Sequence, residues 1–192
     1  PLALSDLVGL DVAAHVADNL YEAYGERMKP AAIWGALKQL RAKLGSQPKL
    51  LTKGGKAVQE SVLRSITELR KSNGSASGAR LSREAIAQRL VFPVINEAAI
   101  CLAEGVARRP EDIDLAMVFG TGFAPFRGGP LQYAQSIGIQ KVVDGLHELA
   151  KTHPHLAPSD ALVEYARRGT FADASSTAKG NNNSVETSRV AG

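Results

Sequence analysis

Apolar side chains recur every three or four residues over most of the chain, which is the period of an amphipathic α-helix. Near the N-terminus this pattern predicts a short helix that ends near Gly9, followed by a longer helix that Asp11 caps. The expected apolar face of the longer helix consists of Val12, Val16 and Leu20. Pro30 then opens a third helix.

The character of the sequence changes over residues 46–81. The stretch "SQPKLLTKGGK" is polar and rich in turn-forming residues, and "NGSASGA" is typical of a flexible connection. Between them, "AVQESVLRSITELRKS" predicts one amphipathic helix. We therefore expect residues 46–81 to be an inter-domain linker that carries a single helix.

The strongest helical pattern covers residues 81–106 and contains Pro93. Because proline lacks an amide hydrogen and clashes with the preceding turn, Pro93 should kink this helix. A second helix should begin at Pro110 and end at Gly120, and three further helices follow. Residues 171–192 lack an apolar period, so we expect a disordered tail.

Composition agrees with an all-α fold. Hydrophobic residues make up 44% of the chain but aromatic residues only 5%, so the core must consist mainly of Ala, Leu, Val and Ile. The net charge of +4 is small, and no run of basic residues is interleaved with aromatic ones, so no nucleic-acid partner is expected. Cys101 is the single cysteine, which excludes an internal disulfide. No signal peptide and no run of about 18 apolar residues is evident, so no membrane span is expected.

The glycine-rich stretch "FGTGFAPFRGGP", residues 119–130, raises the question of a nucleotide-binding loop. It matches neither G-x-x-x-x-G-K-[ST] nor G-x-G-x-x-G, and no βαβ pattern surrounds it. A tight connection between two helices is favoured, in which Phe123 and Phe126 seal the loop against a core or an apolar ligand. Arg127 is the one charge of the loop, and its partner is either an anionic ligand or a carboxylate of the protein.

Other polar residues are weaker candidates for a site. Asn96 and Glu97 follow Pro93 closely, and they either contribute to a binding site, satisfy the carbonyls that the kink frees, or face solvent. Three histidines occur near one predicted helix end: His147, His153 and His155. Their spacing does not indicate a metal site, and no Ser-His-Asp or Cys-His arrangement has a supporting pattern. The residues of this chain therefore do not predict a catalytic centre.

The sequence also aligns with itself at an offset of 129 residues. In this alignment Pro1, Leu2 and Gly9 match Pro130, Leu131 and Gly138. Chance similarity between amphipathic helices is one explanation, and an internal duplication is the one we favour. A duplication predicts two related helical domains, of which the first lacks its front part. That part would then lie upstream of Pro1 in a longer protein.

Two stretches, "RLVFPVINEA" and "FGTGFAPFRGGP", resemble the C-terminal region of the multifunctional fatty-acid β-oxidation enzymes. These are the enoyl-CoA hydratase/3-hydroxyacyl-CoA dehydrogenase proteins, or fatty oxidation complex alpha subunits. The first twenty residues resemble the first of the two helical domains in their dehydrogenase part. The resemblance implies an all-α fold of two domains of the 6-phosphogluconate-dehydrogenase C-terminal type. Residues 1–45 would be a remnant of the first domain and 82–170 the second, on either side of the linker 46–81 and before the tail 171–192.

The resemblance also implies a function. The parent enzyme would be an NAD-dependent L-3-hydroxyacyl-CoA dehydrogenase, whose Rossmann domain binds NAD and carries a catalytic His-Glu pair; this chain contains neither. In the family an Asn helps to orient that pair, and the matching position here is Gln88. We therefore expect the chain to bind no NAD by itself and to be inactive alone, while helping to shape the acyl-CoA site. The candidate substrate contacts are Arg127, Phe126, Asn96 and Glu97.

The expected partners follow from the same resemblance: the acyl-CoA substrate, the upstream Rossmann and hydratase domains, and a second copy or a thiolase subunit. A cytoplasmic location is expected, since the chain ends "RVAG" rather than in a peroxisomal signal. A stand-alone helical interaction or dimerisation module without catalytic activity is the alternative.

Overall fold

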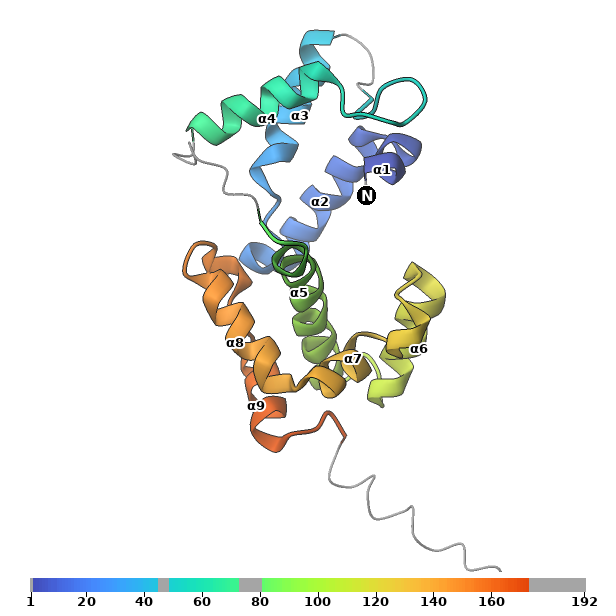
Figure 1. Cartoon of the computed structure of the whole chain (residues 1–192), viewed down its shortest axis with the longest axis vertical. Helices are drawn as coiled ribbons and strands as arrows, with labels where there is room; N and C mark the ends of the chain where they lie inside the picture. The colour runs from blue at the N-terminus through green and yellow to red at the C-terminus, as the bar shows by residue number, and fades with distance from the viewer. Residues whose placement is uncertain (1, 45–48, 73–80, 173–192) are drawn as a thin grey trace, which may run out of the picture. The chain divides into compact units, whose positions relative to one another are not determined.

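The computed structural model describes residues 2–44, 49–72 and 81–172, which fold into two compact units (Figure 1). The first unit lies within Pro1–Arg80 and the second within Leu81–Gly192. Within the described ranges both units are built from helices, and their strand-like pairing is one antiparallel bridge between Leu51 and Val58. The all-α prediction is confirmed.

The first unit contains four α-helices and one 3₁₀ turn over its described residues. They are α1 (Leu2–Val8), α2 (Leu10–Tyr24), η1 (Gly25–Met28), α3 (Ala32–Leu44) and α4 (Glu60–Ser72). Its small core consists of Leu10, Leu37, Leu50 and Val62. Two of these four residues come from the segment that the sequence indicated as a linker.

That segment is part of the first unit rather than a free connection. The expected helix exists as α4, and α4 packs along α3. Leu50 and Val62 are each 3% exposed. Burial of these apolar side chains in the small core stabilises the first unit. The described part of the expected linker, residues 49–72, therefore belongs to this unit; residues 46–48 and 73–80 lie outside the described ranges.

Helix α2 begins two residues earlier than expected and buries a different face. Its N-cap is Gly9, with φ 101°, and no side chain caps it, so the expectation that Asp11 is the cap is wrong. The buried positions are Leu10 and Ala14. The expected apolar face stays exposed, at 47% for Val12, 50% for Val16 and 40% for Leu20.

The second unit contains five α-helices and two 3₁₀ turns over its described residues. They are α5 (Arg83–Ala103), α6 (Pro110–Thr121), η2 (Pro125–Arg127), α7 (Pro130–Ile137), α8 (Ile139–Ala150), η3 (Pro154–Leu156) and α9 (Asp160–Arg168). Helix α5 contacts α7, α8 and α9, with α8 and α9 to one side of it and α6 to the other (Figure 1). It is thus the central helix of this unit.

Helix α5 begins at Arg83, two residues after the expected start at Leu81, and its N-cap is Ser82, whose Oγ accepts a hydrogen bond from Ala85 N at 3.1 Å. It continues as one helix through Pro93. Its buried residues are Phe92, Ile95, Ala98 and Ala99. Among the described residues α5 is also the one helix whose length and mean hydropathy, 1.4, match those of a membrane span. Helix α5 contributes four residues to the buried core of the second unit.

The fold of the second unit extends beyond the last helix. Gly169, with φ 73°, ends α9 and lets the chain turn back, so that Phe171 becomes buried against Tyr165 with ring centroids 5.2 Å apart. The expectation of a disordered tail from residue 171 is therefore wrong for Phe171. Residues 173–192 lie outside the described ranges.

One backbone feature recurs in both units. Gly9 before α2 and Gly138 before α8 are both N-caps with positive φ, 101° and 94°, and the next residue, Leu10 or Ile139, is buried. This shared conformation supports the expected internal duplication, which stays a prediction.

Candidate functional site

The glycine-rich stretch forms the corner between α6 and α7. Helix α6 ends at Thr121, one residue after the expected end at Gly120, and Gly122 caps it in the left-handed conformation with φ 72°. After the short turn η2, Gly128 and Gly129 again have positive φ, 78° and 113°. Within residues 122–129 the corner therefore has three glycines in conformations that residues with side chains rarely adopt.

Asp114 joins the two helices of this corner. It lies in α6 and is only 7% exposed. Its Oδ1 accepts a hydrogen bond from Leu131 N at 2.8 Å, and its Oδ2 accepts one from Gln132 N at 2.9 Å. The N-terminus of α7, where unpaired amides and the helix dipole favour an anion, is therefore capped by a carboxylate of the protein itself. This geometry supports a helix-to-helix connection over a phosphate-binding loop.

The charge state of Asp114 reflects two opposing effects. Burial raises the pKa of the Asp114 carboxyl, and the negative charge of Glu111 raises it further. The hydrogen bonds from Leu131 and Gln132 lower this pKa but do not offset the burial. Asp114 therefore holds its proton to a higher pH than an exposed aspartate does.

Gly129 is required by the position of Asp114. A Cβ atom at residue 129 would lie 2.5 Å from Asp114 Cγ, closer than Cβ contacts in folded proteins. Its φ of 113° is also a conformation that side-chain-bearing residues rarely adopt. The glycine therefore allows α7 to approach the carboxylate.

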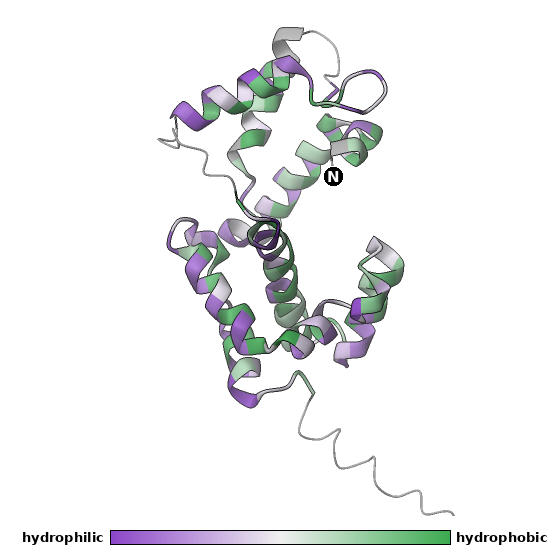
Figure 2. Cartoon of the chain, viewed as in Figure 1, coloured by the Kyte–Doolittle hydropathy of each residue, from purple (hydrophilic) through white to green (hydrophobic). Residues whose placement is uncertain are grey.

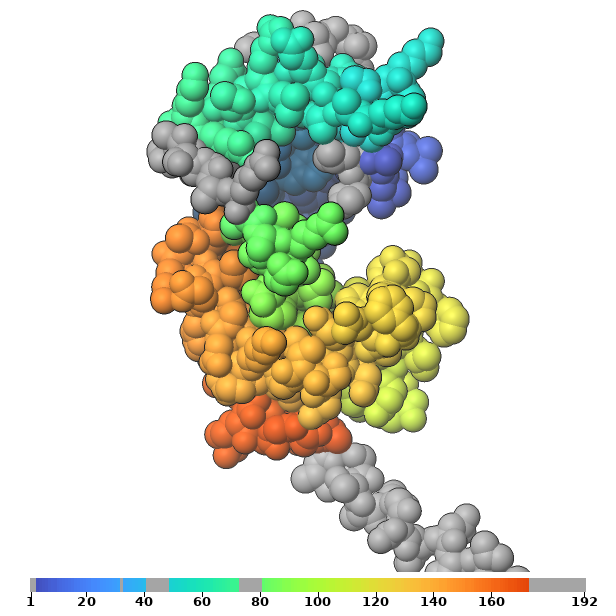
Figure 3. All heavy atoms as spheres, in the orientation of Figure 1, coloured from blue at the N-terminus to red at the C-terminus, as the bar shows by residue number. Residues whose placement is uncertain are grey.

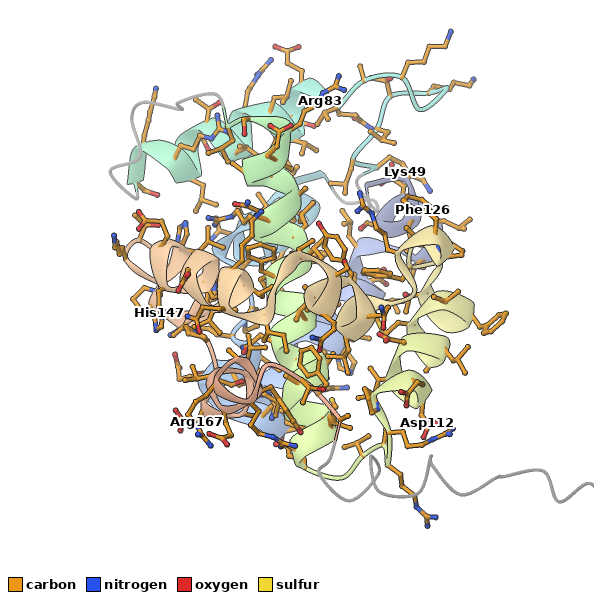
Figure 4. The ribbon with its side chains drawn as sticks, turned by 60° about the horizontal axis from the view of Figure 1, so that its bottom comes forward. Lys49, Arg83, Asp112, Phe126, His147 and Arg167 are labelled. Atoms are coloured by element: carbon orange, nitrogen blue, oxygen red, sulfur yellow. The ribbon has the colours of Figure 1, made fainter. Side chains whose placement is uncertain are left out.

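Arg127 stands at the surface of the same corner. Its guanidinium carbon lies 5.4 Å from the ring centroid of Phe126 and 5.0 Å from that of Tyr133 on α7. Phe126 is 84% exposed and lies at the end of α6 opposite Asp112 (Figure 4). A guanidinium that lies over aromatic rings can still present its N–H groups to an anion.

The other two candidates from the sequence, Asn96 and Glu97, lie on the central helix α5 rather than at the corner. The Asn96 Oδ1 accepts a hydrogen bond from Ser159 N at 2.8 Å, and its Nδ2 donates to Ala157 O at 3.5 Å. Asn96 therefore links α5 to the start of α9. Glu97, the next residue of α5, is half-buried. The described contacts bring Arg127 and Phe126 together with Tyr133, and place Asn96 with the segment before α9.

A small cleft of about 170 Å³ adjoins the Asp114 side chain. It lies between the start of α6, helix α7 and the segment after α9, and Asp114 and Phe171 are among its lining residues. Gln135 crosses this region and donates from Nε2 to Gly169 O at 2.8 Å. Glu111 is the other charged residue of the lining.

Helix α6 also exposes apolar side chains. Leu115 is 54% exposed and Phe119 is 84% exposed, one helical turn apart. Figure 2 colours the later turns of α6 mainly hydrophobic, and Figure 3 shows the segment at the surface of the second unit. Together with Phe126, these residues form what we call the α6 patch: Leu115, Phe119 and Phe126.

The histidines do not assemble a site. His153 and His155 have ring centroids 6.0 Å apart beside η3, and His147 lies on α8. Within the described residues no group of three or more His, Cys, Asp or Glu side chains is arranged to hold a metal ion.

Residues 86–178 match the model of a protein family described as "3-hydroxyacyl-CoA dehydrogenase, C-terminal domain". The matched segment is similar to that family. The chain is also 35% identical over 171 residues to the fatty acid oxidation complex subunit alpha of Vibrio parahaemolyticus, and 36% identical over 172 residues to that of Shewanella loihica. Each alignment covers 88% of this chain and 24% of the relative, so the chain spans about a quarter of the length of these curated relatives. The resemblance found from the sequence is confirmed.

The family segment begins within α5 and contains the whole α6–α7 corner. Asp114, the glycine loop and Arg127 therefore lie within the segment that matches the 3-hydroxyacyl-CoA dehydrogenase C-terminal domain model. Sequence reasoning selected Arg127 and Phe126 but missed Asp114. The one available signal was a charged residue within the apolar run "IDLAMVFG", followed by a glycine pair before proline.

Proposed function

We propose that the chain is the C-terminal helical part of an NAD-dependent L-3-hydroxyacyl-CoA dehydrogenase of fatty-acid β-oxidation, in which it shapes the acyl-CoA site and contacts neighbouring domains. The observation that supports this role is Arg127, held by Phe126 and Tyr133 at the surface of the family domain. A coenzyme A thioester offers phosphate groups for a guanidinium and apolar or flat groups for an exposed ring.

The reaction of the parent enzyme would transfer a hydride from C3 of an L-3-hydroxyacyl-CoA to NAD⁺ while a base accepts the hydroxyl proton. The described residues contain no strand followed by a G-x-G-x-x-G turn, so we assign no NAD-binding group to them. What this chain supplies is binding and orientation of the substrate. We expect no turnover of acetoacetyl-CoA with NADH by the chain alone.

We further propose the partners that this role requires: acyl-CoA, the Rossmann and hydratase domains of the parent protein, and a second copy or a thiolase subunit. The relatives are named as subunits of a complex, which supports partner subunits for the parent protein. A cytoplasmic location is part of the same proposal.

Titration of the chain with acetoacetyl-CoA, followed by calorimetry or by NMR, tests the binding role. Arg127→Ala should weaken binding about tenfold, the factor expected from loss of one charge-assisted contact. Arg167→Ala is the matched control, because Arg167 is an exposed arginine on α9 that pairs with Glu164 instead. Equal affinity of the Arg127→Ala variant and the wild type, or no binding at millimolar concentration, would exclude this role.

A shorter ligand distinguishes the source of the contact. Acetoacetyl-pantetheine lacks the nucleotide phosphates of coenzyme A, so Arg127→Ala should not change its affinity if Arg127 binds phosphate. An equal loss for both ligands would place Arg127 at the acyl end instead.

The α6 patch favours a second candidate, a helical interaction or dimerisation module without catalytic activity. Exposed aromatic residues are enriched at protein interfaces. Sedimentation velocity should then show dimers that Phe119→Ser disrupts, while Val163→Ser, at a 41% exposed apolar residue on α9, leaves them intact. Dimers of this kind together with no acyl-CoA binding would favour the module over the proposed enzyme part.

A further inference from the structure

Asp114 is costly for the fold. It is the one charged side chain that the described part of the chain buries, at 7% exposure. Burial of a carboxylate is unfavourable unless its oxygens are hydrogen-bonded, and here each oxygen accepts one of two consecutive α7 amides. An apolar residue at this position of α6 would add to the core but could not bind these amides. The arrangement therefore fixes one geometry of the corner instead of adding apolar burial.

The contacts extend from Asp114 to Arg127 in two steps. Asp114 fixes the first turn of α7, where the Tyr133 amide donates to Gly129 O at 3.0 Å. The Tyr133 ring then lies 5.0 Å from the Arg127 guanidinium carbon. A shift of the α7 N-terminus would therefore move the ring on which Arg127 rests.

We propose that Asp114 is a positioning residue for Arg127: by capping α7 it holds Tyr133, and through Tyr133 it sets where the guanidinium is presented. The consequence for acyl-CoA binding rests on the proposed function above. Asp114 itself is buried, and its two carboxylate oxygens accept hydrogen bonds from the Leu131 and Gln132 amides.

The experiment compares the full chain with Asp114→Asn by NMR and by acetoacetyl-CoA titration. Asparagine keeps the shape of the side chain but has only one acceptor oxygen, so one α7 amide loses its partner. The amide signals of Leu131 and Gln132 should move and exchange faster, and the ring-current shift of the Arg127 side chain should diminish. Asp112→Asn is the matched control, because Asp112 lies in the same helix but pairs with the exposed Arg109.

Affinity tests the coupling between the two residues. Asp114→Asn should weaken acetoacetyl-CoA binding about as much as Arg127→Ala does, and the double variant should be no weaker than either single one. A purely structural role of Asp114 would lower stability but leave the Arg127 ring-current shift unchanged, and would give additive losses. Either of those two results would overturn the proposal.

The same data separate this proposal from the proposed function. If Arg127→Ala does not alter acyl-CoA affinity, the binding role fails, whereas the positioning of Arg127 is still decided by its ring-current shift in Asp114→Asn. An unchanged shift rejects the positioning role whatever the affinities are.

A wild-type titration covers the case in which Asp114→Asn does not fold. As the pH is lowered until Asp114 is protonated, the Leu131 and Gln132 amide signals and the Arg127 signals should shift with one common midpoint. Around Asp114 the cleft presents Glu111 from α6, Gln132 and Gln135 from α7, and Thr170 and Phe171 after α9, so Glu111 is the only other titratable group among the described lining residues. Glu111→Gln removes its contribution. Arg127 signals that do not follow the amide signals would contradict the proposal.

Discussion

The side-chain oxygen of Asn96 accepts a hydrogen bond from the amide of Ser159 at 2.8 Å, across 63 residues of sequence. Ser159 is in turn the N-cap of α9, where its Oγ accepts from Leu162 N at 3.2 Å. One side chain of the central helix therefore fixes the start of the last helix. This gives Asn96 a structural task that does not require a substrate.

Replacement of Asn96 should therefore lower stability. Asn96→Ala leaves the half-buried Ser159 amide without its acceptor and should reduce the free energy of unfolding by about 1–2 kcal/mol. Asn96→Asp keeps an acceptor oxygen and should cost less. Urea denaturation followed by circular dichroism measures both, with Gln88→Ala as an exposed control on α5. Equal stability of wild type and Asn96→Ala would contradict the structural role.

Two glycines of the corner should respond differently to the same substitution. Gly122→Ala and Gly129→Ala both place a side chain at positive φ, which costs about 1–2 kcal/mol. At residue 129 the new Cβ also collides with Asp114, whereas nothing lies within 4 Å at residue 122. Gly129→Ala should therefore lose about 1–3 kcal/mol more than Gly122→Ala. Thermal unfolding measures the difference, and equal losses would mean that α7 can move away from Asp114 at no cost.

The helices were predictable because their signals are local. Pro110 lies at the first position of α6, and a capping serine precedes both α5 and α9. The glycine–proline corner was also recognised as a helix connection, together with Arg127 and Phe126. These features depend on neighbours within one or two turns, which a single sequence displays.

These errors share one cause, which is contact with a residue outside the same helix. From the sequence alone Asp114 is expected to face solvent, but in the structure it accepts a hydrogen bond from Leu131, 17 residues later. From the sequence alone Phe171 is expected to belong to a polar tail, but in the structure its ring packs against that of Tyr165. Likewise, α4 belongs to the first unit because its apolar residues pack against those of α3. Periodicity indicates which residues are apolar, but not which partner covers them.

His153 should make stability depend on pH below neutrality. Burial lowers the pKa of His153 from its ordinary value of 6.5, and the positive charges of Arg89 and His155 lower it further. Below that ordinary value the unfolded chain binds the proton before the folded chain does, so the free energy of unfolding falls as the pH decreases. His153→Gln should remove this part of the slope between about pH 7 and pH 5.

Arg89→Gln is the matched variant for this test. Loss of the Arg89 charge should bring the pKa of His153 back toward its ordinary value and so reduce the slope without removing the imidazole. The measurement is the urea midpoint as a function of pH. Identical slopes for wild type and His153→Gln would show that His153 is protonated equally in both states.

The contact between Phe92 and Gly145 sets the effect of a glycine-to-alanine change inside a helix. Such a change usually stabilises a helix by about 0.5–1 kcal/mol, because glycine is the more flexible residue in the unfolded chain. At Gly145 in α8, however, the new Cβ would lie 2.8 Å from Phe92 Cδ2, and Phe92 is only 3% exposed, so its ring cannot move aside. Gly145→Ala should therefore destabilise by about 1–3 kcal/mol.

Gly120 in α6 has nothing within 4 Å, so Gly120→Ala should follow the usual direction. Thermal unfolding gives the sign for each, and a stabilised Gly145→Ala variant would mean that α5 and α8 are less tightly packed than the structure shows.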